Sequence, residues 1–361
     1  MTDRSRIKVG FVLLSHSRAP IPSTRIAALN MFPLLRADGF DPHIAFEPEQ
    51  GTQTPDVDAL LPELVAGAFD IIVFQKVHGA SVERLAHGLR AAGIKTVFAL
   101  CDVVDVAMAR ATDMTVIVTD YLKSLYPADL QNKIRVVHDG IEHPDIHKHD
   151  WGTHRGSAAQ PLRAVLVTSA ELYRLPALPP LPEWLQVTIV GRYAPSVLAR
   201  LRSARWRYQG LENGADKIAL LRFLANRRIR CVPWHPQKVY DAMCAADIGI
   251  IPIDTVPAHL AGTPAPDWKV KSENRLTMKM AVGLPVVATP IPSYEPVVTQ
   301  GENAWLARDA AEWLRCLDAL RDPAARAAMG QAARASALRR YSMQEQARLL
   351  AAALREVLAA R

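Results

Sequence analysis

The sequence predicts an α/β protein with two doubly wound parallel sheets, and three observations support this prediction. The 361 residues exceed one ordinary domain and fit two domains of about 150–200 residues each. Short apolar runs alternate with helical segments in both halves, which is typical of parallel strands joined by crossover helices. Residues 143–162 lose this alternation and become polar, so we expect a linker there.

Each element expected in the first half follows from its local pattern. The apolar runs have the length of strands and end at polar residues, as in parallel strands covered on both faces. The expected strands are 8–14, 40–46, 70–75, 95–100, 115–118 and 134–137, and the expected helices are 23–38, 81–92 and 122–125. We expect Ser23 or Thr24 to cap the first helix, because a hydroxyl there accepts a hydrogen bond from a free backbone N–H.

The alternation resumes at residue 163. The expected strands are 163–168, 186–190, 229–233, 248–252 and 286–289, and the expected helices are 237–245, 275–280, 310–320, 323–340 and 343–358. Gly283 and Pro285 end the helix before the last strand, since glycine often follows a helix and proline cannot continue one. The apolar run Val286-Val287-Ala288 then predicts a strand buried on both faces.

Composition narrows the class of protein. Half of the residues are hydrophobic, which is enough for two buried cores. No apolar run approaches the roughly 20 residues of a transmembrane helix, and the charged N-terminus does not predict a secretory signal. The four cysteines are scattered without a CxxC pair, so no disulfide framework is expected. We therefore expect a cytoplasmic protein.

The net charge of +7 is concentrated in one segment. Between Arg192 and Arg230 there are ten basic residues and two acidic ones, Glu212 and Asp216. This segment is either a solvated arginine-rich face or a surface that attracts phosphate-bearing ligands or an anionic membrane. Nucleic acid is not expected as a partner, because aromatic residues are few and no binding motif is present.

Several short motifs gather between residues 229 and 345. They are 246–252 (ADIGIIP), 280–289 (MAVGLPVVAT), 295–298 (EPVV) followed by 301–306 (GENAWL), and the tail from Arg326 to Ser342. In the first half, 137–141 (VHDGI) is similar to a segment that precedes the linker in one family. Together these motifs resemble those of the GT-B glycosyltransferases, especially the retaining family 4 group.

The resemblance implies the GT-B architecture, in which two Rossmann-like parallel-sheet domains face a cleft. The first domain (1–145) would hold the acceptor, and the second (163–340), reached through a linker (146–162), would hold a nucleotide-diphosphate-sugar donor. The C-terminal helix (341–361) would pack back on the first domain. No metal and no separate cofactor are implied, because positive side chains and a helix N-terminus neutralise the diphosphate.

The sequence departs from the family pattern at one point. The family has two glutamates eight positions apart, and this sequence has Val270 and Met278 there. A methionine cannot accept hydrogen bonds from the ribose hydroxyls as a carboxylate does, and an unpaired buried hydroxyl costs about 1–3 kcal/mol. Either Glu273 or Glu295 takes over this role, or the donor sits differently. The pattern 271–275 (KSENR) is similar to that of one branch of the family.

The residues expected to bind the donor are polar or positively charged. Lys271 and Arg275 would stabilise the diphosphate charge that grows as the glycosidic bond breaks, and Lys271 is the expected catalytic cation. Asn274 would bind ribose or phosphate, or cap the helix. Trp234 would stack on the base or else pack between helices. The expected donor-binding residues are Arg192, Trp234, Lys269, Lys271, Glu273, Asn274, Arg275 and Glu295.

Polar residues also follow the strands of the first half, where ligands bind in parallel sheets. Asp102 and Asp105 are the expected catalytic carboxylates, which would orient or deprotonate an acceptor hydroxyl. For Asp102, capping of the next helix is the alternative. The expected acceptor-side residues are Arg25, Gln75, Lys76 and His78.

A group of histidines suggests a metal site at first sight. They are His138, His143, His147, His149 and His154. They lie in an irregular segment without the paired spacing of a zinc site. We therefore expect solvated linker residues and no metal site.

The predicted function is transfer of a sugar from a nucleotide-diphosphate-sugar to a glycan or lipid-linked acceptor, as in cell-envelope polysaccharide or glycoconjugate synthesis at the inner face of a membrane. Two alternatives stay open. A nucleotide-sugar 2-epimerase on the same fold would turn over its substrate without an acceptor. A catalytically silent nucleotide- or glycan-binding protein is favoured by Val270 and Met278. The loop 254–266 is expected to border the donor site.

Overall fold

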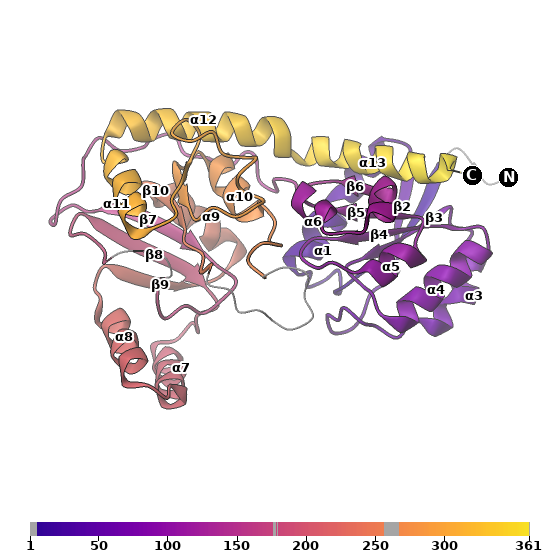
Figure 1. Cartoon of the computed structure of the whole chain (residues 1–361), viewed down its shortest axis with the longest axis horizontal. Coiled ribbons are helices and arrows are strands. Elements are labelled where there is room, and N and C mark those ends of the chain that lie inside the picture. The colour runs from indigo at the N-terminus through magenta and orange to yellow at the C-terminus, as the bar shows by residue number, and fades with distance from the viewer. Residues whose placement is uncertain (1–5, 176–177, 179, 256–266, 361) are drawn as a thin grey trace. The chain divides into compact units, whose positions relative to one another are not determined.

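The computed structural model describes residues 6–175, 178, 180–255 and 267–360 (Figure 1). Apart from Asp254 and Thr255, the predicted donor-site loop 254–266 lies outside the described residues. The chain divides into two compact units. The first comprises Met1–Glu142, Pro257–Asn274 and Arg340–Arg361, and the second comprises His143–Val256 and Arg275–Arg339. The sequence did not predict that residues 267–274 belong with the first half.

The first unit contains a six-stranded parallel sheet with the order β2-β1-β3-β4-β5-β6. Its strands are β1 (Ile7–Val12), β2 (Phe40–Phe46), β3 (Ile71–Gln75), β4 (Lys95–Leu100), β5 (Met114–Ile117) and β6 (Ile134–Val136). The predicted strands of the first half are confirmed, with small shifts at their ends. The strand order reverses at β1, and ligands bind at such points in doubly wound sheets.

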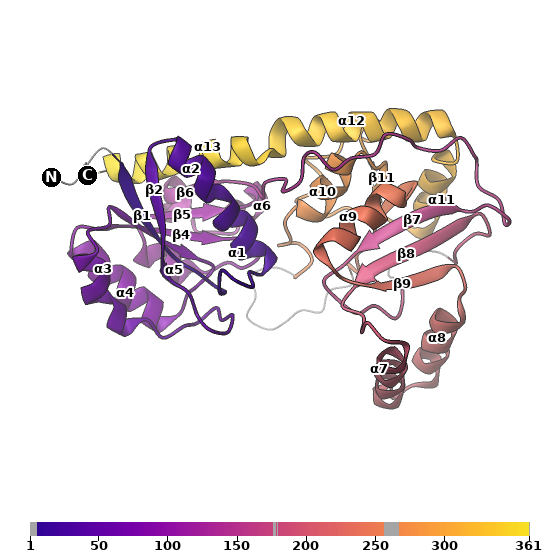
Figure 2. The ribbon, with the colours of Figure 1, turned by 180° about the vertical axis from the view of Figure 1, so that it is seen from behind.

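Helices cover both faces of this sheet (Figures 1 and 2). They are α1 (Pro22–Ala27), α2 (Phe32–Ala37), α3 (Leu61–Ala66), α4 (Ala80–Ala91), α5 (Val106–Ala111), α6 (Asp120–Ser124) and α13 (Met343–Ala359), with the 3-10 helices η1 (Leu29–Met31), η2 (Asp58–Leu60) and η3 (Ala128–Lys133). On one face Phe74 packs in a core with Leu85 of α4. On the other, Phe11 packs in a core with Leu350 of α13.

The predicted continuous helix 23–38 is wrong, because the segment is divided into α1, η1 and α2. The chain leaves the helical conformation at Ala28, which has φ −131° and ψ −71°. Pro33 lies in the first turn of α2, where its missing N–H is tolerated. The cap prediction is also wrong, since the N-cap of α1 is Ile21 without a side-chain hydrogen bond. The hydroxyl of Thr24 instead donates to Gln75 Oε1 at 2.9 Å.

The second unit also contains a six-stranded parallel sheet, with the order β12-β11-β10-β7-β8-β9. Its strands are β7 (Leu162–Val167), β8 (Leu185–Gly191), β9 (Ile229–Pro233), β10 (Ile248–Ile251), β11 (Val286–Ala288) and β12 (Trp305–Leu306). Its helices are α7 (Val197–Gly210), α8 (Gly214–Ala225), α9 (Pro236–Ala245), α10 (Asn274–Val282), α11 (Ala310–Ala319) and α12 (Pro323–Tyr341). The two sheets confirm the predicted α/β class, whereas α7, α8 and β12 were not predicted.

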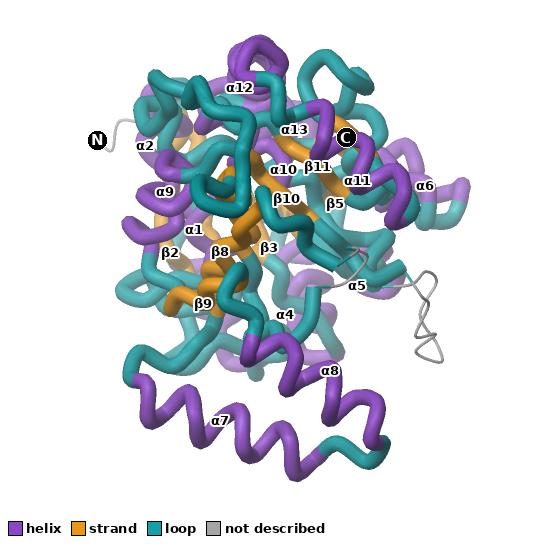
Figure 3. The backbone as a smooth tube through the Cα atoms, turned by 90° about the vertical axis from the view of Figure 1, so that its left-hand side faces the viewer, coloured by secondary structure: helices purple, strands orange, loops and turns teal. Residues whose placement is uncertain are grey.

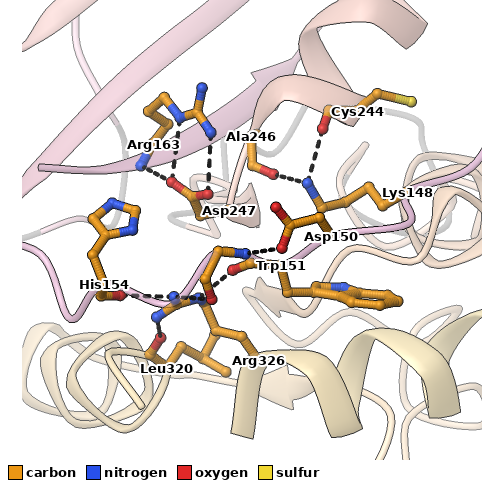
Figure 4. Close-up of polar contacts among 11 residues, drawn as sticks. Lys148, Asp150, Trp151, His154, Arg163, Cys244, Ala246, Asp247, Leu320 and Arg326 are labelled. Carbon is orange, nitrogen blue, oxygen red and sulfur yellow. Dashed lines mark hydrogen bonds and ion pairs between the residues drawn. The ribbon is translucent and has the colours of Figure 1, made fainter. Parts of the chain in front are cut away.

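The segment predicted as a solvated linker is irregular but packed. Lys148 is buried, and its Nζ donates to the carbonyl oxygens of Cys244 and Ala246 at 2.8 and 2.7 Å (Figure 4). Trp151 Nε1 donates to Gly283 O at 2.7 Å. The buried Arg326 donates to the carbonyl oxygens of Trp151, Gly152 and His154. Buried carbonyl groups outside regular structure need such donors, so these side chains hold the segment on the second unit.

α10 ends as predicted and contains a fully buried lysine. Gly283 has φ +87°, and Leu284 N donates to Lys279 O. Lys279 lies against Gly249 of β10, where an added Cβ would be 3.1 Å from Lys279 Cδ. Lys279 Nζ donates to Arg275 O at 3.3 Å, and burial lowers the pKa of the amine to about 7.

We expect Lys279→Met to stabilise the protein at pH 7. The pKa of Lys279 in the folded state lies below its ordinary value of 10.5, so the unfolded chain binds the proton more tightly. The contribution of Lys279 to the free energy of unfolding therefore rises as the pH goes from 7 towards 10.5. In thermal unfolding curves, the stability that Lys279→Met gains over the unmodified protein should therefore decrease over this pH range. Lys238→Met, at an exposed lysine of α9, is the matched control. If Lys279→Met increased stability by the same amount at every pH, the unfavourable burial of the charged amine would be contradicted.

Candidate active site

Polar residues of the second unit gather where its strands end. Ser169 follows β7, Arg192 follows β8, Trp234 follows β9, and Arg275 lies in the first turn of α10. We call these four residues the second-sheet edge. Because β7, β8 and β9 are parallel neighbours, their carboxyl ends lie on the same side of the sheet.

Short contacts tie these loops together. Arg275 Nη2 lies 3.4 Å from Ser169 Oγ, and Arg192 N donates to Ala170 O at 3.2 Å. Trp234 N donates to Gly191 O at 2.7 Å. A Cβ at Gly191 would lie 2.5 Å from Ala170 O, so this close approach of two loops requires glycine.

Two side chains at the second-sheet edge are available to a ligand. Trp234 is 43% exposed, so its indole is not fully enclosed by protein. The side chain of Arg192 is also exposed. In the turn after β11, Ser293 Oγ is buried and has no hydrogen-bond partner among the described residues, while the neighbouring Glu295 is exposed. A buried hydroxyl without a partner is unusual and suits a ligand contact.

The other residues predicted to bind the donor belong to the first unit. They are Lys269, Lys271, Glu273 and Asn274. Lys271 Nζ pairs with Asp267 at 2.8 Å, and Lys269 lies over the ring of Trp268. Glu273 is 1% exposed, and its Oε1 lies 2.7 Å from His138 Nδ1. The donor roles of these residues stay predictions, and the structure divides the predicted set between the two units.

In the first unit, the predicted catalytic and acceptor-side residues lie in pairs. Lys76 Nζ lies 2.6 Å from Asp102 Oδ1, and His78 Nδ1 lies 3.1 Å from Asp105 Oδ2. Lys76 has φ +59°, a conformation that costs energy for a residue other than glycine. Its backbone N donates to Ala99 O at 2.7 Å, which holds this conformation.

Neighbouring groups shift the pKa of one member of each pair. Burial alone would lower the pKa of Lys76, but the neighbouring Cys101 and Asp102 more than offset this, and the pKa is raised. The hydrogen bond from His78 and those from backbone N–H groups outweigh burial and lower the pKa of Asp105. Asp105 caps α5 by accepting from Met108 N at 2.9 Å. Asp102 is therefore not the helix cap that we considered as its alternative role.

The sequence analysis did not expect two further residues of the first unit, which follow β6, to belong to the candidate site. His138 was expected to be solvated, but its ring is largely buried and packs edge-on against Tyr341, with centroids 5.0 Å apart. Asp139 is buried beside Glu273 and accepts a hydrogen bond from Ser272. The position of the VHDGI motif, directly after a strand, was the signal that would have indicated them.

The remaining acceptor-side predictions are occupied by contacts within the first unit. Gln75 is buried, and its Oε1 accepts from Thr24 Oγ1. Arg25 makes two hydrogen bonds to Glu142, at 2.6 and 3.0 Å, and Asn30 donates to the same carboxylate. A cavity in this unit is lined in part by Gln75, Cys101, His138 and Asp139. Among the described residues there is no group of three or more side chains suited to hold a metal ion.

Residues 175–352 match the family model described as Glycosyl transferase-like. No curated protein sequence matches the chain. HepE from Anabaena, solved with UDP and glucose, has 14% identity and a TM-score of 0.64, with 97% of this chain and all of that chain covered. A glycosyltransferase from Rickettsia africae has 12% identity and a TM-score of 0.67, with 99% and 100% covered.

Sucrose-phosphate synthase from Thermosynechococcus elongatus has 13% identity and a TM-score of 0.62, with 99% and 100% covered. These matches and the two parallel sheets decide the architecture. The chain has the GT-B glycosyltransferase fold. In this GT-B chain the glycosyl transferase-like match covers most of the second unit, including the second-sheet edge from Arg192 onward.

Asp139→Asn is expected to stabilise the GT-B chain at pH 7.5. Burial and the neighbouring Glu273 raise the pKa of Asp139 from 3.8 to about 6. The unfolded chain therefore loses this proton more readily, and stability falls as the pH rises from about 4 through 6. The shift corresponds to on the order of 3 kcal/mol at pH 7.5.

In unfolding measurements, Asp139→Asn should raise the free energy of unfolding by its full amount above pH 6. Below pH 4 it should leave the free energy of unfolding unchanged. Glu49→Gln, at an exposed carboxyl of the same unit, should change stability little at either pH. If Asp139→Asn destabilised the protein at pH 7.5, the unfavourable burial of this charge would be refuted.

Proposed function

We propose that the protein is a glycosyltransferase that moves a sugar from a nucleotide-diphosphate-sugar to a glycan or lipid-linked acceptor. The observation that carries the proposal is the second-sheet edge, where an exposed indole and two arginines stand beside the start of α10. This combination suits a base, a diphosphate and the partial positive charge of a helix N-terminus.

The diphosphate is the group that this edge fits best. As the glycosidic bond breaks, its electron pair moves to the phosphate oxygen, and the leaving nucleoside diphosphate gains charge. Arg192 and Arg275 would stabilise that charge by charge-assisted hydrogen bonds. The unpartnered hydroxyl of Ser293 would supply one further hydrogen bond.

The first unit would bind the acceptor. Its carboxylates at Asp102 and Asp105 are held by Lys76 and His78, so their positions are fixed before a ligand arrives. The acceptor hydroxyl loses its proton as its oxygen bonds to the sugar, and a carboxylate or imidazole in this group would receive that proton. Retention of configuration, as in family 4, remains part of the proposal and rests on the resemblance alone.

The structural neighbours give the donor class some support. HepE has been solved in complex with UDP and glucose and in complex with UDP-glucose. A uridine diphosphate sugar is therefore the first donor to test here. The acceptor would belong to cell-envelope polysaccharide or glycoconjugate synthesis, and a lipid-linked acceptor would bring the enzyme to a membrane surface.

A catalytically silent binding protein is the second candidate, because the family glutamates are replaced. Val270 is buried in the core of the first unit and cannot receive a ribose hydroxyl. Met278 lacks an oxygen acceptor. We propose that the exposed carboxylate of Glu295 takes over ribose binding. Binding of the nucleotide sugar without transfer to any acceptor would favour the silent protein.

Arg275→Ala tests the phosphate role. We expect it to weaken binding of the best nucleoside diphosphate by about tenfold or more, since a hydrogen bond to a charged group contributes about 1.5–3 kcal/mol. Binding of the corresponding nucleoside, which lacks phosphate, should be unchanged. Calorimetric titration of both ligands measures the difference, with Arg315→Ala on α11 as the matched control. Equal effects on the two ligands would contradict the assignment.

Trp234→Ala tests the stacking role and should show the opposite selectivity. Nucleoside and nucleoside diphosphate should both bind about 1–3 kcal/mol more weakly, because each presents the same base to the indole. The same titrations give this comparison. An effect on the diphosphate alone would mean that the indole does not contact the base.

A further inference from the structure

The helical hairpin α7–α8 exposes an unusual amount of apolar surface. Among the described residues, eight of the thirteen exposed large apolar side chains lie on these two helices. They are Val197, Leu198, Leu201, Trp206, Tyr208, Ile218, Leu221 and Leu224. Trp206 is 77% exposed and Leu198 is 70% exposed. Patches of this kind mark interaction sites rather than ordinary protein surface.

The hairpin stands out from the sheet of its own unit. Figures 1 and 3 show α7 and α8 side by side beyond β9. Their inner sides are anchored, because Ala204, Leu220 and Phe223 pack into the core of the second unit. The exposed apolar side chains are thus presented on a fixed support. These exposed side chains are not part of the hydrophobic core of the unit.

The same helices carry a strong positive charge. α7 has four arginines and no acidic residue, and α8 with its flanks adds further basic residues. Within the described part of the chain, no carboxylate pairs with an arginine of α7. Arg205 and Arg207 flank Trp206 directly. The arginines of α7 are Arg200, Arg202, Arg205 and Arg207.

We propose that the α7–α8 hairpin docks on the surface of an anionic phospholipid bilayer. Its apolar side chains would enter the boundary between headgroups and acyl chains, and its arginines would contact the lipid phosphates. Apolar and basic residues alternate along α7, as in Leu201-Arg202 and Arg205-Trp206-Arg207. Such interleaving suits a headgroup layer, where both kinds of side chain find partners side by side.

Other partners fit these observations less well. A second copy of the chain would bring two sets of positively charged arginines together, and like charges repel. A nucleic acid would not cover the leucines and valine. A protein partner would need acidic residues matched to the positions of these arginines, whereas an anionic bilayer supplies phosphates over its whole surface. In the described chain no helix is long and apolar enough to span a bilayer, so contact through this hairpin would be peripheral.

The proposal is tested by sedimentation of the full-length protein with lipid vesicles, without nucleotide. The vesicles contain phosphatidylcholine alone or an equimolar mixture of phosphatidylcholine and phosphatidylglycerol. We expect binding to the anionic vesicles only, and weaker binding at higher salt. Because no nucleotide is present, the outcome does not depend on the proposed glycosyl transfer.

Two double variants locate the surface. Leu201→Ser with Trp206→Ser removes apolar insertion, and Arg202→Gln with Arg205→Gln removes charge. Each should weaken binding, the charge variant by roughly thirtyfold, since each basic residue near an anionic surface contributes about 1 kcal/mol. Leu314→Ser with Arg315→Gln, at an exposed pair on α11, is the matched control and should bind normally. Thermal unfolding confirms that each variant is folded.

Several results would overturn the proposal. Binding to neither kind of vesicle would do so, as would equal binding to neutral and anionic vesicles. Unchanged binding of both hairpin variants would place the contact elsewhere. If the protein sedimented as a dimer that the apolar variant dissociated, the hairpin would be an interface between copies of this chain.

Discussion

The burial of both sheets on both faces is the constraint on which the rest of the structure depends. Every residue of β3, β5, β10 and β11 is buried. Charged side chains therefore cannot lie along these strands without a large desolvation cost. They emerge where the strands end, and both groups of candidate site residues are found there. The fold thus determines where the site lies, and the residues at the strand ends determine its chemistry.

The fold could be predicted from the sequence because its signals are local. Apolar runs of strand length gave the strands of both sheets apart from the two-residue β12, and Gly283 gave the end of α10. The break in the helix after β1 was missed, because it falls at Ala28, and alanine is a good helix former. α7 and α8 were missed because their apolar residues are mostly exposed and do not form one buried stripe.

The candidate site could be predicted only in part, because its contacts join residues that are distant in the sequence. Asp102 and Asp105 were expected from their place after a strand, but their partners Lys76 and His78 were given only as acceptor-side residues. The contact of Glu273 with His138 joins positions separated by 135 residues. Nothing in the local pattern indicates that residues 267–274 belong to the first unit.

Burial favours the neutral form of Asp139 in the first unit and of Lys279 in the second. Asp139 stands among the acceptor-side residues, where raised pKa values are common in active sites. Lys279 lies one turn after Arg275 in α10, and its side chain fills the space above Gly249. Both groups lower stability at neutral pH. This cost is consistent with selection for function at Asp139, whereas Lys279 has a structural place but no ligand-facing atom.

The central claim is that the strand ends of the second unit bind a nucleoside diphosphate. Hydrogen exchange of backbone amides, measured with and without saturating UDP-glucose, tests this most directly. The account predicts slower exchange at residues 168–170, 191–193, 234–236 and 274–277 when the ligand is bound. Protection confined to the strand ends of the first unit, or none with any nucleotide sugar, would contradict it.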